Sequence, residues 1–194
     1  MGPDEARLRA ALAQPAGASS DYDLNPELTL PPDRRLTEAA VLVGVWQGRV
    51  LLTKRASGLK HHPGQIAFPG GKVDVGDDGA AGAALREAWE EIGLSPANVD
   101  VLGALPPHET VTGYRITPVL GLVRAAFVPV PQEAEVAEIF SVPLSHVADP
   151  ANFAIEQREW RGVWRRYYAV PFGPHYIWGA TARILRGLAD RMAL

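Results

Sequence analysis

The chain has 194 residues, of which 47% are hydrophobic and 21% charged, so it is expected to form one globular domain with its own core rather than a disordered segment. It contains no cysteine, which excludes disulfides, cysteine-ligated zinc and a cysteine nucleophile. A net charge of −3 without any lysine or arginine run argues against a nucleic-acid partner, and an anionic substrate would need a cation between itself and the protein.

The N-terminal residues predict neither export nor membrane attachment. Residues 1–7 lack the apolar run of a secretory signal, and Ala6 stands where a myristoylation motif requires serine or threonine. No stretch of the chain is apolar over the length of a transmembrane helix. We therefore expect a cytoplasmic protein without a membrane partner.

Helix and strand patterns alternate along the chain. Residues 4–14 predict a short helix, and the prolines of 15–36 predict a surface loop, so 1–36 is expected to be an extension of a main domain, 37–194, that includes the C-terminal helix. The further elements are strands over 41–46, 50–53, 65–68, 99–105 and 116–123, a mixed strand and turn segment over 136–142, a strand pair over 158–170, and helices over 80–92 and 178–192, with 56–80 mostly loop. This order predicts an α/β or α+β class.

The helix over 80–92 has the clearest pattern. At about 100° per residue, one side collects the apolar residues and is expected to be buried: Ala81, Ala84, Leu85, Ala88, Trp89 and Ile92. Glu87, Glu90 and Glu91 fall within about 100° of one another on the opposite side. Gly93 suits the left-handed position after a helix, and Asp77 or Asp78 can cap the first turn.

Three carboxylates so close together repel one another. Each pair costs a few tenths of a kcal/mol on an exposed helix, and the helix dipole disfavours negative charge in this C-terminal half. Arg86 can relieve part of this repulsion, whereas a divalent cation would relieve all of it, and carboxylate oxygens suit Mg²⁺ or Mn²⁺. Taken alone, Glu-x-x-Glu-Glu is more often a solvated acidic face than a metal site.

A glycine pair stands upstream of this helix, in Phe68-Pro-Gly-Gly71-Lys72. Glycines let the backbone approach a ligand closely and expose its polar groups. The carbonyl of Gly70 could therefore serve as a metal ligand, and the amides of the loop could bind phosphate.

The segment from Gly71 to Leu94 resembles the Nudix box, G-x5-E-x7-R-E-U-x-E-E-x-G-U, where U is apolar. Gly71 fits its first glycine, and Arg86 to Leu94 fit its second half without a gap. The middle is one residue longer and has aspartate for glutamate, so the first acid falls on Asp77 or on Asp78. This resemblance implies an α/β/α sandwich with a mixed β-sheet between helices.

The same resemblance implies hydrolysis of a nucleoside diphosphate linked to another group, with Mg²⁺ or Mn²⁺ as cofactor. By motif position, the metal ligands would be Glu87, Glu90, Glu91 and the Gly70 carbonyl, Glu87 is also a candidate base, and Arg86 would hold a glutamate in place. A further acid often follows the box, and we favour Glu135 over Glu133 and Glu138, which are expected to be solvated.

The segment from Leu51 to Gly71 resembles the coenzyme A pyrophosphatase branch of this family. It carries a Leu-Leu-Thr strand, a basic residue four before a glycine, and Phe-Pro-Gly-Gly, although Lys60 stands where the branch has arginine. The longer box and residues 177–182 resemble the same branch. The products implied are 3′,5′-ADP and 4′-phosphopantetheine, and the oligomer implied is a homodimer.

Basic and imidazole groups gather in this segment. Together with its glycines and Phe68, they are the candidate substrate-binding residues: Lys54, Arg55, Lys60, His62, Gly64, Phe68 and Gly71. Solvated loop positions explain Lys60 and His61 equally well, and His62 can instead stabilise the loop through a backbone hydrogen bond.

Other residues have weaker claims. His108 and Glu109 could line the pocket or form a loop tip, and Tyr114 and Arg115 could contact the nucleotide or pack at a strand edge. The tryptophans at 46, 160, 164 and 178 are expected to be core or dimer contacts rather than base-stacking surfaces. Three alternatives to a coenzyme A diphosphatase remain open: a Nudix hydrolase of ADP-ribose, NADH or a nucleoside triphosphate, a non-catalytic nucleotide-binding module, and a protein with a structural cation.

Overall fold

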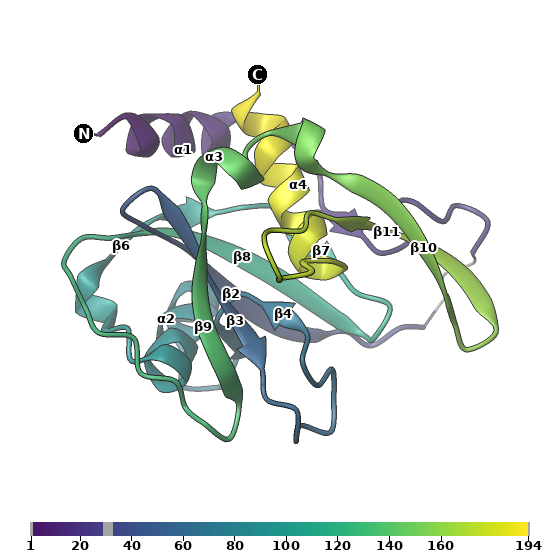
Figure 1. The fold of residues 1–194 in the computed structure, drawn as a ribbon, viewed down its shortest axis with the longest axis horizontal. Helices are drawn as coiled ribbons and strands as arrows, with labels where there is room; N and C mark the ends of the chain where they lie inside the picture. Colours follow the sequence, from purple (N-terminus) through teal and green to yellow (C-terminus); the bar gives the residue numbers. More distant parts are fainter. Residues whose placement is uncertain (1, 29–32, 194) are drawn as a thin grey trace.

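The computed structural model describes residues 2–28 and 33–193. Along these residues run α1 (Pro3–Ala13), β1 (Ser19–Ser20), β2 (Thr37–Trp46), β3 (Arg49–Arg55), β4 (Ile66–Ala67), β5 (Gly70–Lys72), α2 (Gly79–Ile92), β6 (Val99–Ala104), β7 (His108–Glu109), β8 (Tyr114–Val123), β9 (Val136–Pro143), α3 (Leu144–Val147), β10 (Ala154–Trp160), β11 (Val163–Ala169) and α4 (Ala180–Met192), with short 3-10 turns at Pro96–Asn98 and Pro150–Asn152. Figure 1 shows α1 beside the C-terminal end of α4, so the first and last helices lie on the same side of the molecule.

Strands β1 to β9 form one mixed sheet (Figure 1). Its centre is the parallel pair β2 and β8, which are in register from Thr37 opposite Tyr114 to Val45 opposite Leu122. Strand β3 pairs antiparallel with β2 on one side and with β9 on the other. Strands β10 and β11 form a separate antiparallel hairpin.

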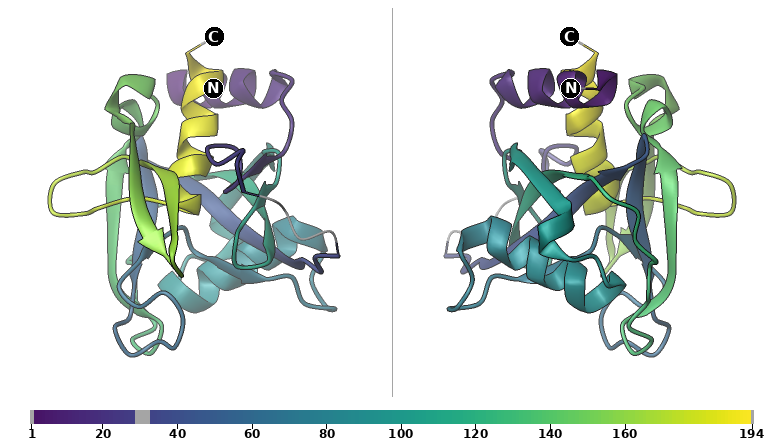
Figure 2. Two further views of the ribbon diagram at one scale, coloured as in Figure 1. Left: turned by 90° about the vertical axis from the view of Figure 1, so that its right-hand side faces the viewer. Right: turned by 90° about the vertical axis from the view of Figure 1, so that its left-hand side faces the viewer.

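Alternate residues of β2 face opposite layers. Ala40 and Leu42 pack in one core cluster with the helix residues Ala84 and Ala88 of α2. Val43 and Val45 pack in the other cluster, together with apolar residues of α1 and α4. Successive side chains of a strand point to opposite faces of the sheet, so both faces contribute to the core. Figure 2 shows α2 on one side of the sheet and α1 with α4 on the other. This confirms the expected α/β fold with a mixed sheet between helices.

The N-terminal extension is packed into the core. Leu8 and Ala11 of α1 are fully buried in the cluster that contains Leu185 of α4, and Arg191 Nη1 donates to the Ala11 carbonyl at 3.2 Å. The loop expected over 15–36 contains β1, which pairs parallel with β7. Residues 29–32 of this loop lie outside the described residues.

Several predicted elements have other bounds in the structure; β2, for example, begins at Thr37 rather than at residue 41. Two differences have a clear cause. The segment over 136–142, expected to be mixed strand and turn, is the strand β9, because β3 pairs with it from Arg49–Pro143 to Arg55–Val136, with one register shift between Lys54 and Arg55. The strand pair expected over 158–170 begins earlier, at Ala154, since Ala154 is opposite Ala169. In both cases a distant partner strand sets the element, which local residue preferences do not reveal. Within the described residues, no helix is both long enough and apolar enough to cross a membrane.

Candidate active site

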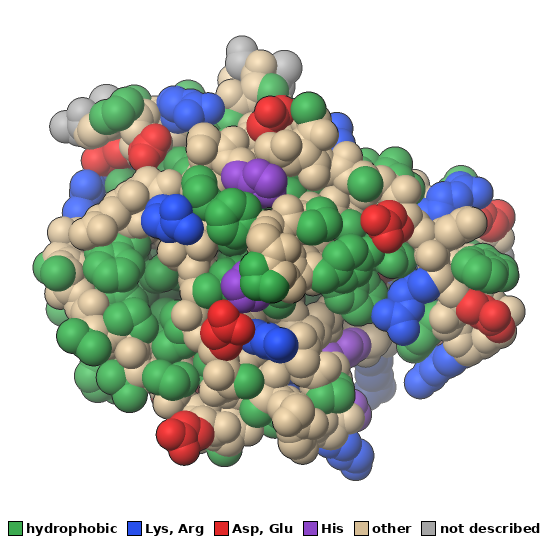
Figure 3. Space-filling model, viewed as in Figure 1, with side chains coloured by type: hydrophobic (Ala, Val, Ile, Leu, Met, Phe, Trp, Pro, Cys, Tyr) green, Lys and Arg blue, Asp and Glu red, His purple; other side chains and the backbone are tan. Residues whose placement is uncertain are grey.

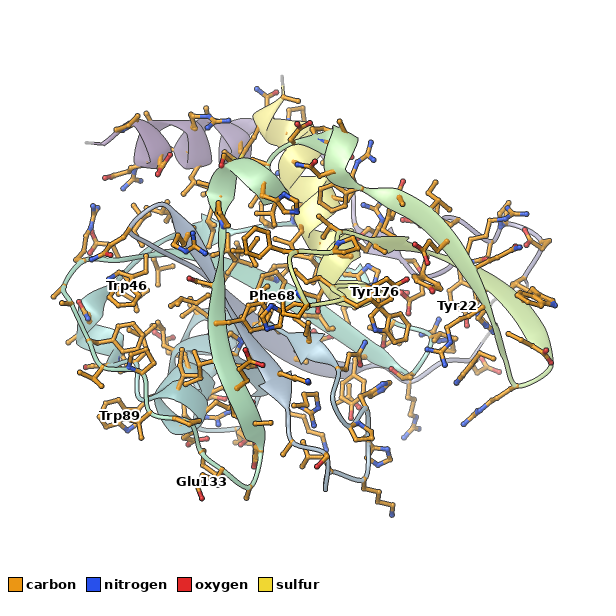
Figure 4. All side chains as sticks on the ribbon, viewed as in Figure 1. Tyr22, Trp46, Phe68, Trp89, Glu133 and Tyr176 are labelled. Carbon is orange, nitrogen blue, oxygen red and sulfur yellow. The ribbon has the colours of Figure 1, made fainter. Side chains whose placement is uncertain are left out.

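Helix α2 presents a different side to the core from the one expected. Glu91 is buried, with 6% of its surface exposed, whereas Trp89 is 55% exposed and points away from the sheet (Figure 4). Around the helix axis, Glu91 lies about 60° from the fully buried Ala88, and Trp89 lies about 100° away in the other direction. The predicted placement of Trp89 on the buried side is therefore wrong: the buried stripe is rotated toward Glu91.

The glycine pair of β5 explains why a carboxylate can be buried there. The Gly70 N–H donates to Glu91 Oε2 at 3.2 Å. A side chain on Gly70 would overlap the Ala40 carbonyl of β2, and a side chain on Gly71 would overlap the Glu87 carboxylate. Only glycine permits this approach at either position, so the two helix carboxylates lie directly against the backbone of β5.

Arg86 ties the loop before α2 to the glutamates of the helix. Its Nε and Nη2 donate to the two carboxylate oxygens of Asp77 at 2.9 and 3.0 Å. Its Nη1 donates to Glu87 Oε1 at 3.0 Å and to Glu90 Oε2 at 3.1 Å. This fork, with donors fixed in one plane, holds both helix carboxylates and the loop in one arrangement.

Of the two aspartates that could take the first acidic position of the motif, Asp77 is the one that pairs with Arg86. It does not cap the helix, and Asp78 occupies the N-cap position without a side-chain hydrogen bond, so the expected cap is absent at both. Gly79, the first residue of α2, has a φ of 62°. Arg86 and the Asp74 N–H hold the pKa of Asp77 below its usual value.

Burial destabilises negative charge at the two inner glutamates. It raises the pKa of Glu91 to about 8, although the Gly70 N–H acts in the opposite direction. Burial also raises the pKa of Glu87, an effect that Arg86 partly offsets. The negative charge of Glu135, on the exposed loop before β9, raises both pKa values further. Three carboxylates are thus within electrostatic reach of one another, which favours a cation among them.

The acidic side chains are of the type that binds a divalent cation, but they are not arranged as a complete set of metal ligands. Within residues 2–28 and 33–193, no three histidine, aspartate or glutamate side chains converge closely enough to form a ready-made metal site. Arg86 holds Glu87 and Glu90 in the observed arrangement, while Glu91 has a single hydrogen bond, from Gly70. The available donors are carboxylate and backbone oxygens, which suit Mg²⁺ or Mn²⁺.

A cavity of about 560 Å³ is lined by the segment that leads into the glycine pair, although Gly70, Gly71 and the α2 glutamates do not line it themselves. Of the candidate substrate-binding residues, His62, Gly64 and Phe68 line it, as does Tyr114. Its volume is in the range of small-molecule sites. Phe68 is two residues from Gly70, a distance of about 7 Å along an extended chain. One short segment therefore contributes Phe68 to the cavity and Gly70 to the hydrogen bond with Glu91.

The remaining candidates lie outside the cavity lining. Lys54 and Lys60 are exposed. Arg55 is half-buried on β3. Burial is the main cause that lowers the pKa of His62, and the positive charge of Arg55 lowers it further; the same charge partly offsets the raised pKa of Glu91. Glu133 is at the loop tip before β9 (Figure 4), and Glu138 Oε1 is 2.9 Å from His175 Nε2.

His108 does not line the cavity. It is fully buried, with Nδ1 at 3.0 Å from Ser19 Oγ and Nε2 at 3.1 Å from Asp21 Oδ1. The histidine thus fastens the N-terminal segment to β7.

The tryptophans have varied surroundings. Trp46 packs on Phe127, with ring centroids 5.0 Å apart, in agreement with a core role. Trp164 is 61% exposed, which contradicts a core role. Trp160 and Trp178 line the cavity, together with residues that the sequence did not single out: Arg158, Arg165 and Tyr167.

The pairing of the hairpin explains this second group. Because Arg158 is opposite Arg165 and Trp160 is opposite Val163, residues 158, 160, 165 and 167 share one face. The alternation of aromatic and basic residues over 158–168 could have indicated that these residues share a face. It does not indicate whether that face contacts the core, a cavity or solvent. Figure 3 shows basic, acidic and hydrophobic side chains interspersed over this hairpin.

The chain matches the family model of the NUDIX domain over residues 35–162. It is 41% identical over 160 residues to "Uncharacterized Nudix hydrolase NudL" of Enterobacter sp. (strain 638), covering 81% of this chain and 83% of that protein. It is 40% identical over 184 residues to the protein of the same name from Pectobacterium atrosepticum, covering 90% and 94%. Among solved structures, the MutT protein of Methanosarcina mazei Go1 matches with a TM-score of 0.49 at 21% identity, over 60% of this chain and 83% of that one.

Proposed function

Because the chain belongs to the Nudix hydrolase family, we propose that it hydrolyses the pyrophosphate link of coenzyme A, or of a coenzyme A derivative, to 3′,5′-ADP and 4′-phosphopantetheine. Membership of the family establishes the coarser activity, hydrolysis of a nucleotide-type substrate, and family members generally use divalent ions such as Mg²⁺ or Mn²⁺. Coenzyme A is the finer assignment that we propose.

The observation that carries this assignment is the path of the segment from Leu51 to Gly71. This segment resembles the coenzyme A branch, and it contributes to both parts of the site. His62, Gly64 and Phe68 line the cavity, while Gly70 and Gly71 lie against Glu91 and Glu87. A substrate whose pyrophosphate sits at the glycine pair would have one of its two organic groups in the cavity.

We assign metal binding to Glu87, Glu90, Glu91 and the Gly70 carbonyl. The ion, when bound, supplies charge neutralisation at the pyrophosphate and activation of water. Arg86 orients Glu87 and Glu90 through its two hydrogen bonds. This pre-organisation limits the rearrangement of the carboxylates that metal binding requires.

Proton transfer is assigned to a carboxylate beside the ligands. Glu87 is half-buried, with a raised pKa, and is our first candidate for the base that accepts a proton from water. Glu135 is the second, since its charge acts on both Glu87 and Glu91. Arg55, whose positive charge acts on Glu91, is assigned to bind a phosphate oxygen. Lys54 and Lys60, being exposed, would attract the anionic substrate from solution.

A substrate panel tests the proposal. The protein would be incubated with Mg²⁺ or Mn²⁺ and with coenzyme A, ADP-ribose, NADH or a deoxynucleoside triphosphate, and kcat/KM compared. We expect the highest value for coenzyme A. A higher value for any other compound would reject the assignment, and tight coenzyme A binding without turnover in Mn²⁺ would instead favour a non-catalytic binding module.

A further inference from the structure

The cavity collects positive charge in a chain whose net charge is negative. Four arginines line it, at positions 158, 165, 166 and 183. Within the described residues, its one lining carboxylate is Asp21. Both oxygens of Asp21 are already engaged, Oδ1 with His108 Nε2 at 3.1 Å and Oδ2 with the Val111 N–H at 2.8 Å. Asp21 accepts no hydrogen bond from these arginines, and its single negative charge is outnumbered by their four positive charges.

Two of the four arginines have carboxylates of their own. Arg183 Nη2 is 3.0 Å from Asp23 Oδ2, and Arg166 Nη2 is 4.0 Å from Glu27 Oε1. Arg158 and Arg165 form no ion pair with any residue that the structure describes. The unbalanced positive charge of the cavity thus lies on the face of the hairpin formed by β10 and β11.

Arg165 is the more constrained of these two side chains. Its Cζ is 5.2 Å from the ring centroid of Trp160 and 5.7 Å from that of Tyr22, so the guanidinium is held among aromatic rings. Its Nε and Nη1 are covered from water, and neither has a hydrogen-bond partner in the described part of the chain. A charge that has lost water without gaining an acceptor is unfavourable. An anion in the cavity would compensate the charge of the guanidinium, whose Nη2 is not among the covered atoms.

The surroundings of these arginines also suit a flat ring. Trp178 lies 5.2 Å from Tyr167 between ring centroids, and Arg158 Cζ lies 4.9 Å from the Trp178 ring. Aromatic rings and guanidinium planes are the surfaces on which nucleotide bases stack. A phosphate and an aromatic base are therefore the two chemical groups that this end of the cavity could recognise together.

We propose that Arg165, assisted by Arg158, binds a second phosphate of the substrate, one that is not part of the pyrophosphate undergoing hydrolysis. The inference rests on the proposed function, because in coenzyme A this group is the 3′-phosphate, one ribose away from the pyrophosphate. It places the adenosine end of the substrate in the cavity beside the hairpin. Selectivity for the 3′-phosphate then comes from the hairpin rather than from Lys60, which is exposed and does not line the cavity.

Binding of two nucleotides tests the subsite without requiring turnover. In the presence of Mg²⁺, titration calorimetry would compare 3′,5′-ADP with 5′-AMP, which lacks the second phosphate. We expect the native protein to prefer 3′,5′-ADP by roughly tenfold or more, since charge-assisted bidentate bonds are strong. Arg165→Met should remove most of this preference while leaving the affinity for 5′-AMP little changed. Arg165→Lys, which keeps the charge but loses the fork, should give an intermediate preference.

Arg161→Met is the matched control. Arg161 is on the same hairpin, and its Cζ is 4.5 Å from the same Trp160 ring, but it does not line the cavity. Its replacement should leave the preference unchanged. The subsite is refuted if Arg165→Met keeps the native preference, or if Arg161→Met lowers it equally.

Coenzyme A and dephospho-coenzyme A separate failure of the subsite from failure of the proposed function. If native protein cleaves coenzyme A but Arg165→Met slows both compounds equally, the subsite is wrong and the function stands. If neither compound is cleaved but the preference for 3′,5′-ADP disappears in Arg165→Met, the subsite stands and the function is wrong.

Discussion

Glu91 has the most perturbed carboxyl group of the site. Its position among three helix glutamates could be predicted from their spacing, but its burial could not. Helical periodicity gives the angles between side chains and leaves open which side meets the sheet. That is decided by Gly70, 21 residues earlier in the chain, whose N–H binds the Glu91 carboxylate. The same rotation exposes Trp89, which apolar character alone had placed in the core.

The raised pKa of Glu91 makes the stability of the metal-free protein depend on pH. The pKa of Glu91 is about 8 in the folded protein, against a usual value of 4.5. The protonated carboxyl group therefore stabilises the folded state fully below about pH 4.5, and this stabilisation is lost as the pH rises through about 8. We expect the melting temperature in a chelator to fall between about pH 5 and pH 9. Glu91→Gln cannot ionise and should show a shallower fall, so equal slopes in the two proteins would show that Glu91 is not the group responsible.

Strand β5 and helix α2 form the element pair on which the site is built. The glycine-rich turn and the acidic helix were each recognisable in the sequence, as was their order. The sequence did not show that the two glycines have different neighbours, Gly70 meeting the backbone of β2 and Gly71 meeting the Glu87 carboxylate. The same limit applies to the hairpin of β10 and β11, whose strands were expected but whose cavity-lining face was not.

The two glycines should respond differently to alanine. Gly70→Ala places a methyl group against backbone that cannot move aside, and should lower the free energy of unfolding by about 1–3 kcal/mol. Gly71→Ala meets the flexible end of Glu87, so it should cost less stability but displace that carboxylate and lower metal-dependent turnover.

Urea unfolding and kcat would be measured for both variants. Gly76→Ala is the control, because no atom lies within 4 Å of the methyl position there. A larger stability loss for Gly71→Ala than for Gly70→Ala would contradict this account, as would full turnover in Gly71→Ala.

At the scale of the whole molecule, the cavity is assembled from segments far apart in the chain. Asp21 and Leu24 come from the N-terminal segment, Arg165 from the hairpin, and Trp178 with Arg183 from the end of the chain. All five lie outside residues 35–162, where the NUDIX model matches. Local sequence patterns indicate the family and its acidic helix. The cavity depends on contacts between distant segments, which a single sequence does not reveal.

The packing of α1 can be tested through Leu8. This residue is fully buried in the core that also contains α4, so Leu8→Ala should lower the free energy of unfolding by roughly 2–5 kcal/mol. Arg7→Ala, on the exposed side of the same helix, should have little effect. Chemical denaturation of both variants measures this, and equal small effects would mean that α1 is dispensable to the core.

The most direct test of the central claim is coenzyme A turnover as a function of Mg²⁺ concentration in the native protein and in Glu91→Gln, with 3′,5′-ADP and 4′-phosphopantetheine measured as products. We expect saturable, metal-dependent formation of both products by the native protein, and a loss of about 10²-fold or more in kcat for a folded Glu91→Gln variant. Full turnover in Glu91→Gln, or turnover by the native protein that is unaffected by removing the metal, would contradict the claim that the α2 carboxylates and the glycine pair hold the cation that cleaves the substrate.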